Sequence, residues 1–143
     1  MLFRSLLSGA DRDAVVSLER ELNAAIPSLI GLSTPPATQG EAGAKAISYR
    51  LASSKKKPLV IPCELASDGA LLLTAFLALA HTASPGVLLI EEPENGLHPT
   101  RIEGVVQLLR RIARGDVGCG ARQVIVTTHS PLLLNYADRK SVV

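Results

Sequence analysis

The chain has 143 residues, of which 47% are hydrophobic and 20% are charged, a balance typical of one globular domain with a sizeable core. Its formal net charge of +2 is too small to indicate a nucleic-acid surface by itself. No segment reaches the ~18 uninterrupted apolar residues of a membrane span, which excludes a membrane-spanning class. The two cysteines have no C-x-x-C partner, so we expect unpaired thiols and a cytoplasmic protein.

Both ends of the chain look foreign to the rest. Residues 1–5 and 138–143 resemble in-frame translations of a common short-read sequencing adapter, in opposite orientations. We therefore expect the native domain to span residues 6–137, with both borders set by the DNA fragment rather than by the protein.

The first half of the chain predicts one helix and a small antiparallel sheet. Apolar residues recur at helical spacing from Asp11 to Ala25, and Pro27 ends the helix. Residues 28–62 then contain three short apolar runs separated by Pro, Gly, Ser and Lys, a pattern typical of a β meander.

The second half alternates helix and strand. Helices are predicted over 68–81 and 100–114, and strands over 86–90 and 123–127. Strands that are apolar on both faces belong to parallel sheets covered by helices. The expected class is therefore α/β, with a parallel-sheet core flanked by helices and a small antiparallel β meander upstream.

The strongest chemical signal is the end of the first of these strands. The apolar run stops at Glu91 and Glu92, and Pro-Glu-Asn-Gly-Leu-His-Pro follows over residues 93–99. Two acids at the carboxyl end of a parallel strand lie where such sheets bind ligands. A first carboxylate can hold Mg²⁺, and the next can orient a water for attack on a phosphate.

Two further segments fit the same chemistry. His129 follows the second strand, and should therefore lie at the same sheet edge as the two acids. Upstream, Ser67 is a suitable N-cap for the apolar helix, and Gly69 leaves its first turn bare. A helix N-terminus of this kind can bind phosphate, although capped helices are common.

In this order, the three segments resemble the nucleotide-binding heads of ABC-type ATPases, in particular the RecF/SMC-like AAA proteins that include the OLD-family ATPases. The resemblance covers residues 65–135 and implies part of a P-loop NTPase fold. It implies ATP and Mg²⁺ as ligands, with Glu91 on the metal side, Glu92 as general base and His129 as the switch histidine. Glu91 departs from the Asp of ABC transporters.

The same resemblance implies a dimer whose ATP sites lie between subunits. The signature motif, here with Ser67, Asp68 and Gly69, reaches the γ-phosphate bound to the opposite subunit. Asn95 and His98 match the D-loop that crosses the interface. A homodimer through the ATP sites, with DNA as a further partner and no membrane, is therefore expected of the full-length protein.

No G-x-x-x-x-G-K-[ST] motif is present in the chain. Residues 40–45 come nearest, but they lack the following hydroxyl and a preceding buried strand, so we reject them. The P-loop holds the β- and γ-phosphates. We therefore expect it upstream of Met1 in the parent protein, and expect this fragment alone to be inactive.

Three alternatives stay open for the parent. An ATP-driven head could serve DNA repair, replication or anti-phage defence. An OLD-type enzyme would carry a Toprim nuclease domain after residue 135. A non-catalytic module with a degenerate nucleotide fold is the third, and the retention of both glutamates and the histidine argues against it. A transporter subunit fits the signature segment less well.

Overall fold

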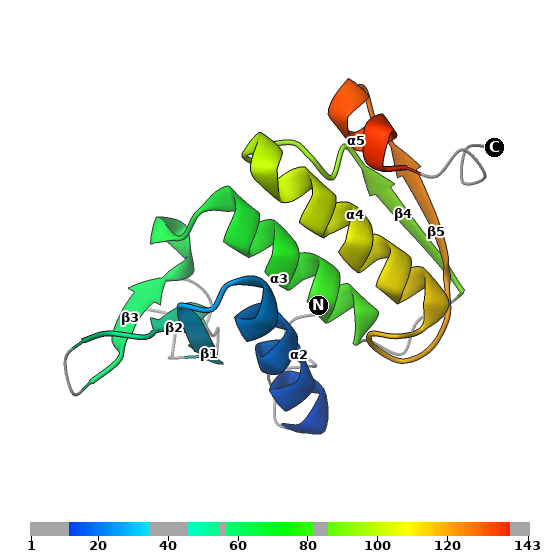
Figure 1. Ribbon diagram of the computed structural model, residues 1–143. Coiled ribbons are helices and arrows are strands. Elements are labelled where there is room, and N and C mark those ends of the chain that lie inside the picture. Colours follow the sequence, from blue (N-terminus) through cyan, green and yellow to red (C-terminus); the bar gives the residue numbers. More distant parts are fainter. Residues whose placement is uncertain (1–11, 35–45, 55–56, 82–85, 138–143) are drawn as a thin grey trace. The chain divides into compact units, whose positions relative to one another are not determined.

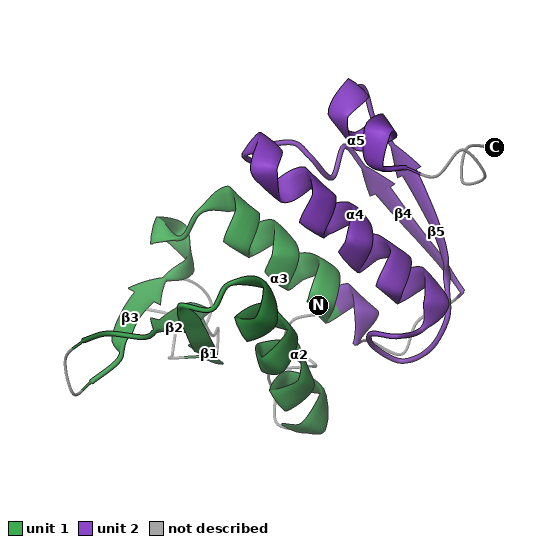
Figure 2. Ribbon diagram, viewed as in Figure 1, with its two compact units in different colours: residues 1–78 green, residues 79–143 purple. Residues whose placement is uncertain are grey.

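The computed structural model describes residues 12–34, 46–54, 57–81 and 86–137 (Figure 1). They fall into two compact units, residues 1–78 and 79–143, whose boundary lies within one helix (Figure 2). The predicted foreign ends and the rejected segment 40–45 lie outside the described residues. Among the described helices, none is long and apolar enough to cross a membrane.

The first unit confirms the predicted helix and meander. In chain order it contains α2 (Arg12–Ala25), β1 (Leu29–Ser33), β2 (Ser48–Leu51), β3 (Leu59–Pro62), the short helix η1 (Cys63–Leu65) and most of α3 (Asp68–Ala80). The three strands form an antiparallel sheet in the order β1-β2-β3. Short connections between neighbouring runs favour this arrangement, because antiparallel strands need only a turn between them.

Helix α2 packs on β1 through both apolar and polar contacts. Leu18 and Leu22 on α2 are buried, as are Leu29 and Leu32 on β1. The Glu19 carboxylate accepts a hydrogen bond of 2.7 Å from the Leu32 amide. The apolar side of α2, with Leu18 and Leu22 four positions apart, therefore packs on β1, as the helical spacing predicts.

A buried side-chain pair ties the meander to α3. The Thr74 hydroxyl donates to the carbonyl of Ala70 at 2.7 Å, so it is left as an acceptor for the Tyr49 hydroxyl at 3.0 Å. Burial raises the pKa of the Tyr49 phenol above its usual 10.0. The helix that begins at the signature segment is thus anchored to the sheet of its own unit.

The second unit is built on two parallel strands. It contains β4 (Val87–Glu91), α4 (Pro99–Arg114), β5 (Gln123–Thr127) and α5 (Pro131–Tyr136). The strands pair in register from Val87 opposite Gln123 to Glu91 opposite Thr127, which confirms the predicted parallel pair. One side of α4 is buried, through Ile102, Val105, Val106, Leu108, Leu109 and Ile112.

One face of this strand pair is open. Leu89 is 72% exposed, and Val87 and Ile125 on the same face are 48% and 45% exposed. Ile90, on the other face, is buried. We expected a sheet covered by helices, but among the described residues of this unit no helix buries this face.

The loop after α4 closes over the last residues of α3, which belong to the second unit. The Arg122 guanidinium donates to the carbonyls of Leu79 and Ala80, at 2.7 Å each. The Cys119 amide also donates to Ala80, at 3.0 Å. Gly118 has a φ of +87°, and a Cβ there would lie 2.0 Å from the Ala80 oxygen. The loop therefore satisfies orphan carbonyls at a helix end, and only glycine fits its closest point.

Candidate functional site

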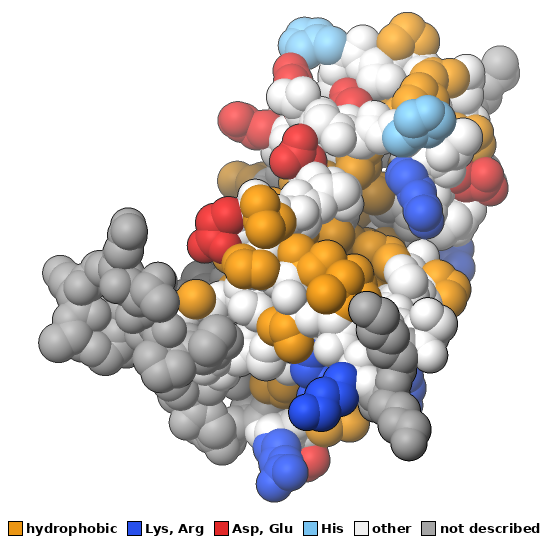
Figure 3. Space-filling model, turned by 90° about the vertical axis from the view of Figure 1, so that its left-hand side faces the viewer, with side chains coloured by type: hydrophobic (Ala, Val, Ile, Leu, Met, Phe, Trp, Pro, Cys, Tyr) orange, Lys and Arg blue, Asp and Glu red, His pale blue; other side chains and the backbone are white. Residues whose placement is uncertain are grey.

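The register of β4 and β5 brings the residues that follow both strands to one edge. Glu91 lies opposite Thr127, and the Glu92 amide then donates to the Thr127 carbonyl at 2.8 Å. Parallel strands end on the same side, so both loops leave from this edge. Acidic and histidine side chains gather at the same end, at the top of Figure 3.

The chain turns sharply where β4 ends. Glu92 has a φ of +43°, the single positive φ among the described non-glycine residues. This left-handed conformation is unfavourable for a residue with a Cβ, by about 1–2 kcal/mol. The Asn95 amide donates to the Glu92 carbonyl at 2.9 Å, and Gly96, with φ +76°, completes the reversal. Strain of this kind clusters at functional sites.

Glu92 and His129 meet across the two loops. His129 Nε2 lies 3.7 Å from Glu92 Oε1, with the side chains 94% and 44% exposed respectively. A separation of 3.7 Å is longer than a hydrogen bond and within ion-pair distance for a protonated histidine. The two atoms are close enough for one further group to contact both. The expected convergence at one edge is seen, while the assigned catalytic roles stay predictions.

Glu91 is the candidate metal ligand. It is the last residue of β4, and its side chain is exposed on the open face of the strand pair. The part of the chain that the structure describes has no group of three or more His, Cys, Asp or Glu able to hold a metal. A single carboxylate fits Mg²⁺, which is commonly bound by one or two carboxylates together with substrate phosphates.

The predicted D-loop residues divide into two cases. Asn95 is exposed in the turn. His98 is also exposed, but its ring has a local function, because Nδ1 accepts from the Thr100 amide at 3.4 Å as the N-cap of α4. This cap is sufficient to explain a histidine before Pro99. A contact of His98 across a dimer interface stays a prediction.

The signature segment lies in the first unit. Ser67 Oγ accepts from the Ala70 amide at 3.3 Å, which confirms the predicted N-cap. Ser67 and Asp68 are exposed, and Gly69 is half-buried in the first turn of α3. The beginning of α3 is therefore a capped helix N-terminus with exposed Ser67 and Asp68, and helix N-termini are positions where anions can bind.

Two residues of the site had no role assigned from the sequence. The Thr128 hydroxyl donates to Glu94 Oε1, and Thr128 Oγ1 accepts from the Ser130 amide at 2.9 Å. Glu94 is the third acid of Glu-Glu-Pro-Glu, and Thr128 directly precedes His129. The sequence signal that could have indicated Glu94 was its position two residues after Glu92, which places it in the same turn.

Three solved structures have a similar fold. The first, from work on ATP-driven dimerization and DNA-stimulated activation of SMC ATPases, has a TM-score of 0.64 at 16% identity, covering 96% of this chain and 77% of that one. The SMC head domain from Thermotoga maritima has a TM-score of 0.56 at 19% identity, and the match covers 96% of this chain and 44% of that one. The third is the Smc head domain of Pyrococcus furiosus with an extended coiled coil, bound to the C-terminal domain of ScpA. It has a TM-score of 0.55 at 17% identity, and the match covers 87% of this chain and 30% of that one.

At these identities the likeness shows the fold, which is the P-loop NTPase fold of SMC ATPase heads. The chain spans less than half the length of the second and third of these structures. The comparison with curated proteins gives no match. A family model described as "AAA domain, putative AbiEii toxin, Type IV TA system" matches residues 6–135, which is most of the chain. The chain therefore belongs to this AAA-domain family, with the fold of an SMC-like ATPase head.

Proposed function

We propose that the parent protein binds and hydrolyses ATP with Mg²⁺ as a dimerising ABC-type ATPase, and that this chain supplies its signature, Walker B and switch segments. The observation that carries the proposal is the approach of Glu92 and His129, 3.7 Å apart at the carboxyl edge of two parallel strands. A carboxylate and an imidazole placed there are suited to a water and to the phosphate that the water attacks.

In this proposal Glu92 is the general base. Its carboxylate accepts a proton from the attacking water. His129 Nε2 donates a hydrogen bond to the terminal phosphate, where negative charge develops. Mg²⁺, when bound beside Glu91, would neutralise phosphate charge.

The exposure of the site supports a dimer. His129 is 94% exposed and Glu92 44% exposed, whereas electrostatic catalysis is strongest where water is excluded. A second subunit that brings its Ser67 turn over this edge would exclude that water. ATP-driven dimerization is named for the SMC ATPases of the first similar structure, as is stimulation by DNA. We therefore propose a homodimer through the ATP sites, with DNA repair or anti-phage defence as its setting.

The test is steady-state ATP hydrolysis by the full-length parent with Glu92→Gln. We expect turnover to fall by about 10²–10⁴-fold, the usual contribution of a general base, with ATP binding retained. Gln107→Ala on the exposed side of α4 is a control away from the strand ends. Turnover of Glu92→Gln within a few-fold of the wild type would remove Glu92 from this role.

A further inference from the structure

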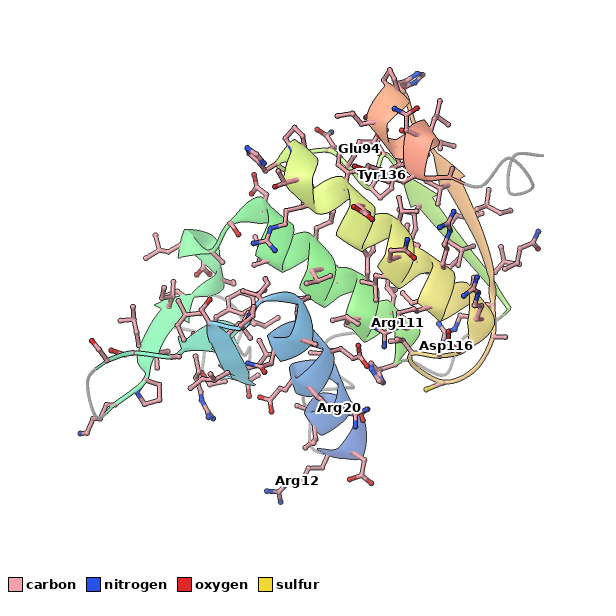
Figure 4. All side chains as sticks on the ribbon, viewed as in Figure 1. Arg12, Arg20, Glu94, Arg111, Asp116 and Tyr136 are labelled. Carbon is pink, nitrogen blue, oxygen red and sulfur yellow. The ribbon has the colours of Figure 1, made fainter. Side chains whose placement is uncertain are left out.

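The turn after β4 and the segment after β5 are joined by hydrogen bonds that involve no catalytic side chain. Thr128 Oγ1 accepts from the Ser130 amide at 2.9 Å, so its single proton is left for Glu94 Oε1. Figure 4 labels Glu94 at this end of the unit. His129 lies between Thr128 and Ser130, and its backbone is therefore held on both sides.

A second bond fixes the other partner of the pair. The Glu92 amide donates to the Thr127 carbonyl at 2.8 Å, while the Glu92 backbone keeps its left-handed φ of +43°. Two residues of one loop are thus tied to two consecutive residues of the other. Pro93, between them, is fully buried and limits the freedom of the turn.

We propose that Glu94 is a positioning residue, which sets the separation of Glu92 and His129 through its bond to Thr128. This inference rests on the proposed function, because the separation matters only if both groups act on one phosphate. Glu94 itself touches neither the water nor the nucleotide in this account. A hydrogen bond to a carboxylate is about twice as strong as a neutral one, which suits a link that must hold two loops.

The second oxygen of Glu94 favours this role over ordinary stabilisation. Oε2 is buried and has no hydrogen-bond partner among the described residues. A buried polar atom left without a partner costs about 1–3 kcal/mol. An apolar pair at positions 94 and 128 would avoid that cost while filling the same space, so the carboxylate is better explained by what its other oxygen holds.

The experiment compares variants of the full-length parent in steady-state hydrolysis. Glu94→Ala and Thr128→Val each remove the bond, and Thr128→Val keeps the side-chain volume. We expect each to lower kcat by about 10–100-fold, the range for supporting residues around a site, with KM for ATP changed by less than about twofold. Because both break one bond, the double variant should be no slower than the worse single variant by more than about twofold.

Conservative variants provide the controls. Thr128→Ser keeps the hydroxyl and Glu94→Gln keeps an acceptor oxygen, so both should recover most of the lost kcat. Ile102→Val, a mild change in the buried cluster of Ile102, Val106 and Leu133, should lower stability without lowering kcat. If Glu94→Ala fails to fold, Thr128→Val decides by itself.

Each outcome separates this inference from the proposed function. If Glu92→Gln is inactive while Glu94→Ala and Thr128→Val keep wild-type kcat, the ATPase proposal stands and the positioning role of Glu94 is wrong. Independent, multiplicative losses in the double variant would also overturn it, as would a loss confined to KM. If the wild-type parent does not hydrolyse ATP, the proposed function fails first. If Glu92→Gln hydrolyses ATP like the wild type, Glu92 loses its role as general base.

Discussion

Two turns of this molecule carry its chemical signal, and they differ in how their backbones are built. The turn before α3 is relaxed, with Ser67 capping the helix by an ordinary hydrogen bond of 3.3 Å. The turn after β4 is strained, with Glu92 at a φ of +43° and Glu94 Oε2 buried without a partner among the described residues. Both were expected to act on the same kind of phosphate.

The difference shows what each turn is suited for. A helix N-terminus binds an anion with amides that are already oriented, so it needs no unusual conformation. A base must instead be placed against a water and a partner histidine, and placement of that kind is where folds tolerate strain. We therefore expect the strained turn to control hydrolysis within its own subunit, and the relaxed turn to act on the partner's site.

The largest expected effect is that this chain alone, unlike the full-length parent, neither hydrolyses ATP nor binds it tightly. Glu91 and Glu92 repel phosphate, and a P-loop normally holds the β- and γ-phosphates and shares the Mg²⁺. Neither turn should replace it, so we expect no ATP hydrolysis and no tight nucleotide binding. Isothermal titration with ATP and Mg²⁺ measures the binding. Micromolar affinity in a monodisperse sample would contradict this.

The open face of β4 and β5 adds a second expectation for the isolated chain. Val87, Leu89 and Ile125 expose apolar surface beside strand edges, which favours association between copies. Light scattering of the same sample should show self-association that grows with concentration. A monomer over the whole range would show that this face is tolerated in water.

Mixing two inactive variants of the full-length parent tests the division between the turns. Glu92→Gln should lower turnover by about 10²–10⁴-fold as a lost general base, and Ser67→Arg by about 10²–10³-fold as a lost phosphate contact. In a dimer of one copy of each variant, one site carries both changes and the other carries neither. Random pairing makes about half of the dimers mixed, so an equal mixture should recover about a quarter of wild-type turnover. Recovery absent at every mixing ratio would place both turns in the same subunit's site.

The loop that closes the end of α3 offers a stability test within the second unit. Gly118→Ala would put a Cβ 2.0 Å from the Ala80 oxygen at a φ of +87°, and should cost about 3 kcal/mol by combining steric overlap with a left-handed backbone. Gly104→Ala, on the exposed side of α4 with open space around it, should instead add roughly 0.5–1 kcal/mol. Urea unfolding of this chain measures both, and equal effects would contradict the close approach.

A smaller effect is expected at the Tyr49 hydroxyl in the first unit. Tyr49→Phe removes one buried hydrogen bond and should cost about 0.5–1.5 kcal/mol, measured by urea unfolding at pH 7. Because the pKa of Tyr49 is raised on folding, the folded state keeps its proton longer than the unfolded state. The wild type should therefore lose stability as the pH rises above about 10, and Tyr49→Phe should lose less.

The smallest expected effect is the gain in stability from relieving the backbone strain at Glu92. Glu92→Asn keeps a polar residue but tolerates the left-handed region better, so it should raise the free energy of unfolding by about 0.5 kcal/mol. Glu92→Gln keeps the same conformational cost and serves as the matched control. A stability loss in Glu92→Asn relative to Glu92→Gln would show that the turn is not strained.

The helices and strands could be predicted from the sequence, because each depends on the pattern of residues close together in the chain. Helical spacing placed α2 and α4, apolar runs placed β4 and β5, and Ser67 marked the start of α3. The parallel pairing of β4 and β5 also followed, since strands joined by a helix run in the same direction. That pairing alone placed Glu92 and His129 at one edge.

Other features depended on residues far apart in the sequence. The Glu92 backbone, which is left-handed, bonds to Thr127 on the neighbouring strand, and the Glu94 to Thr128 link joins residues 34 positions apart. The open face of β4 depends on which helices pack against it. Local propensity encodes which element forms, whereas side-chain partners and buried faces are decided only when the packed chain brings distant groups together.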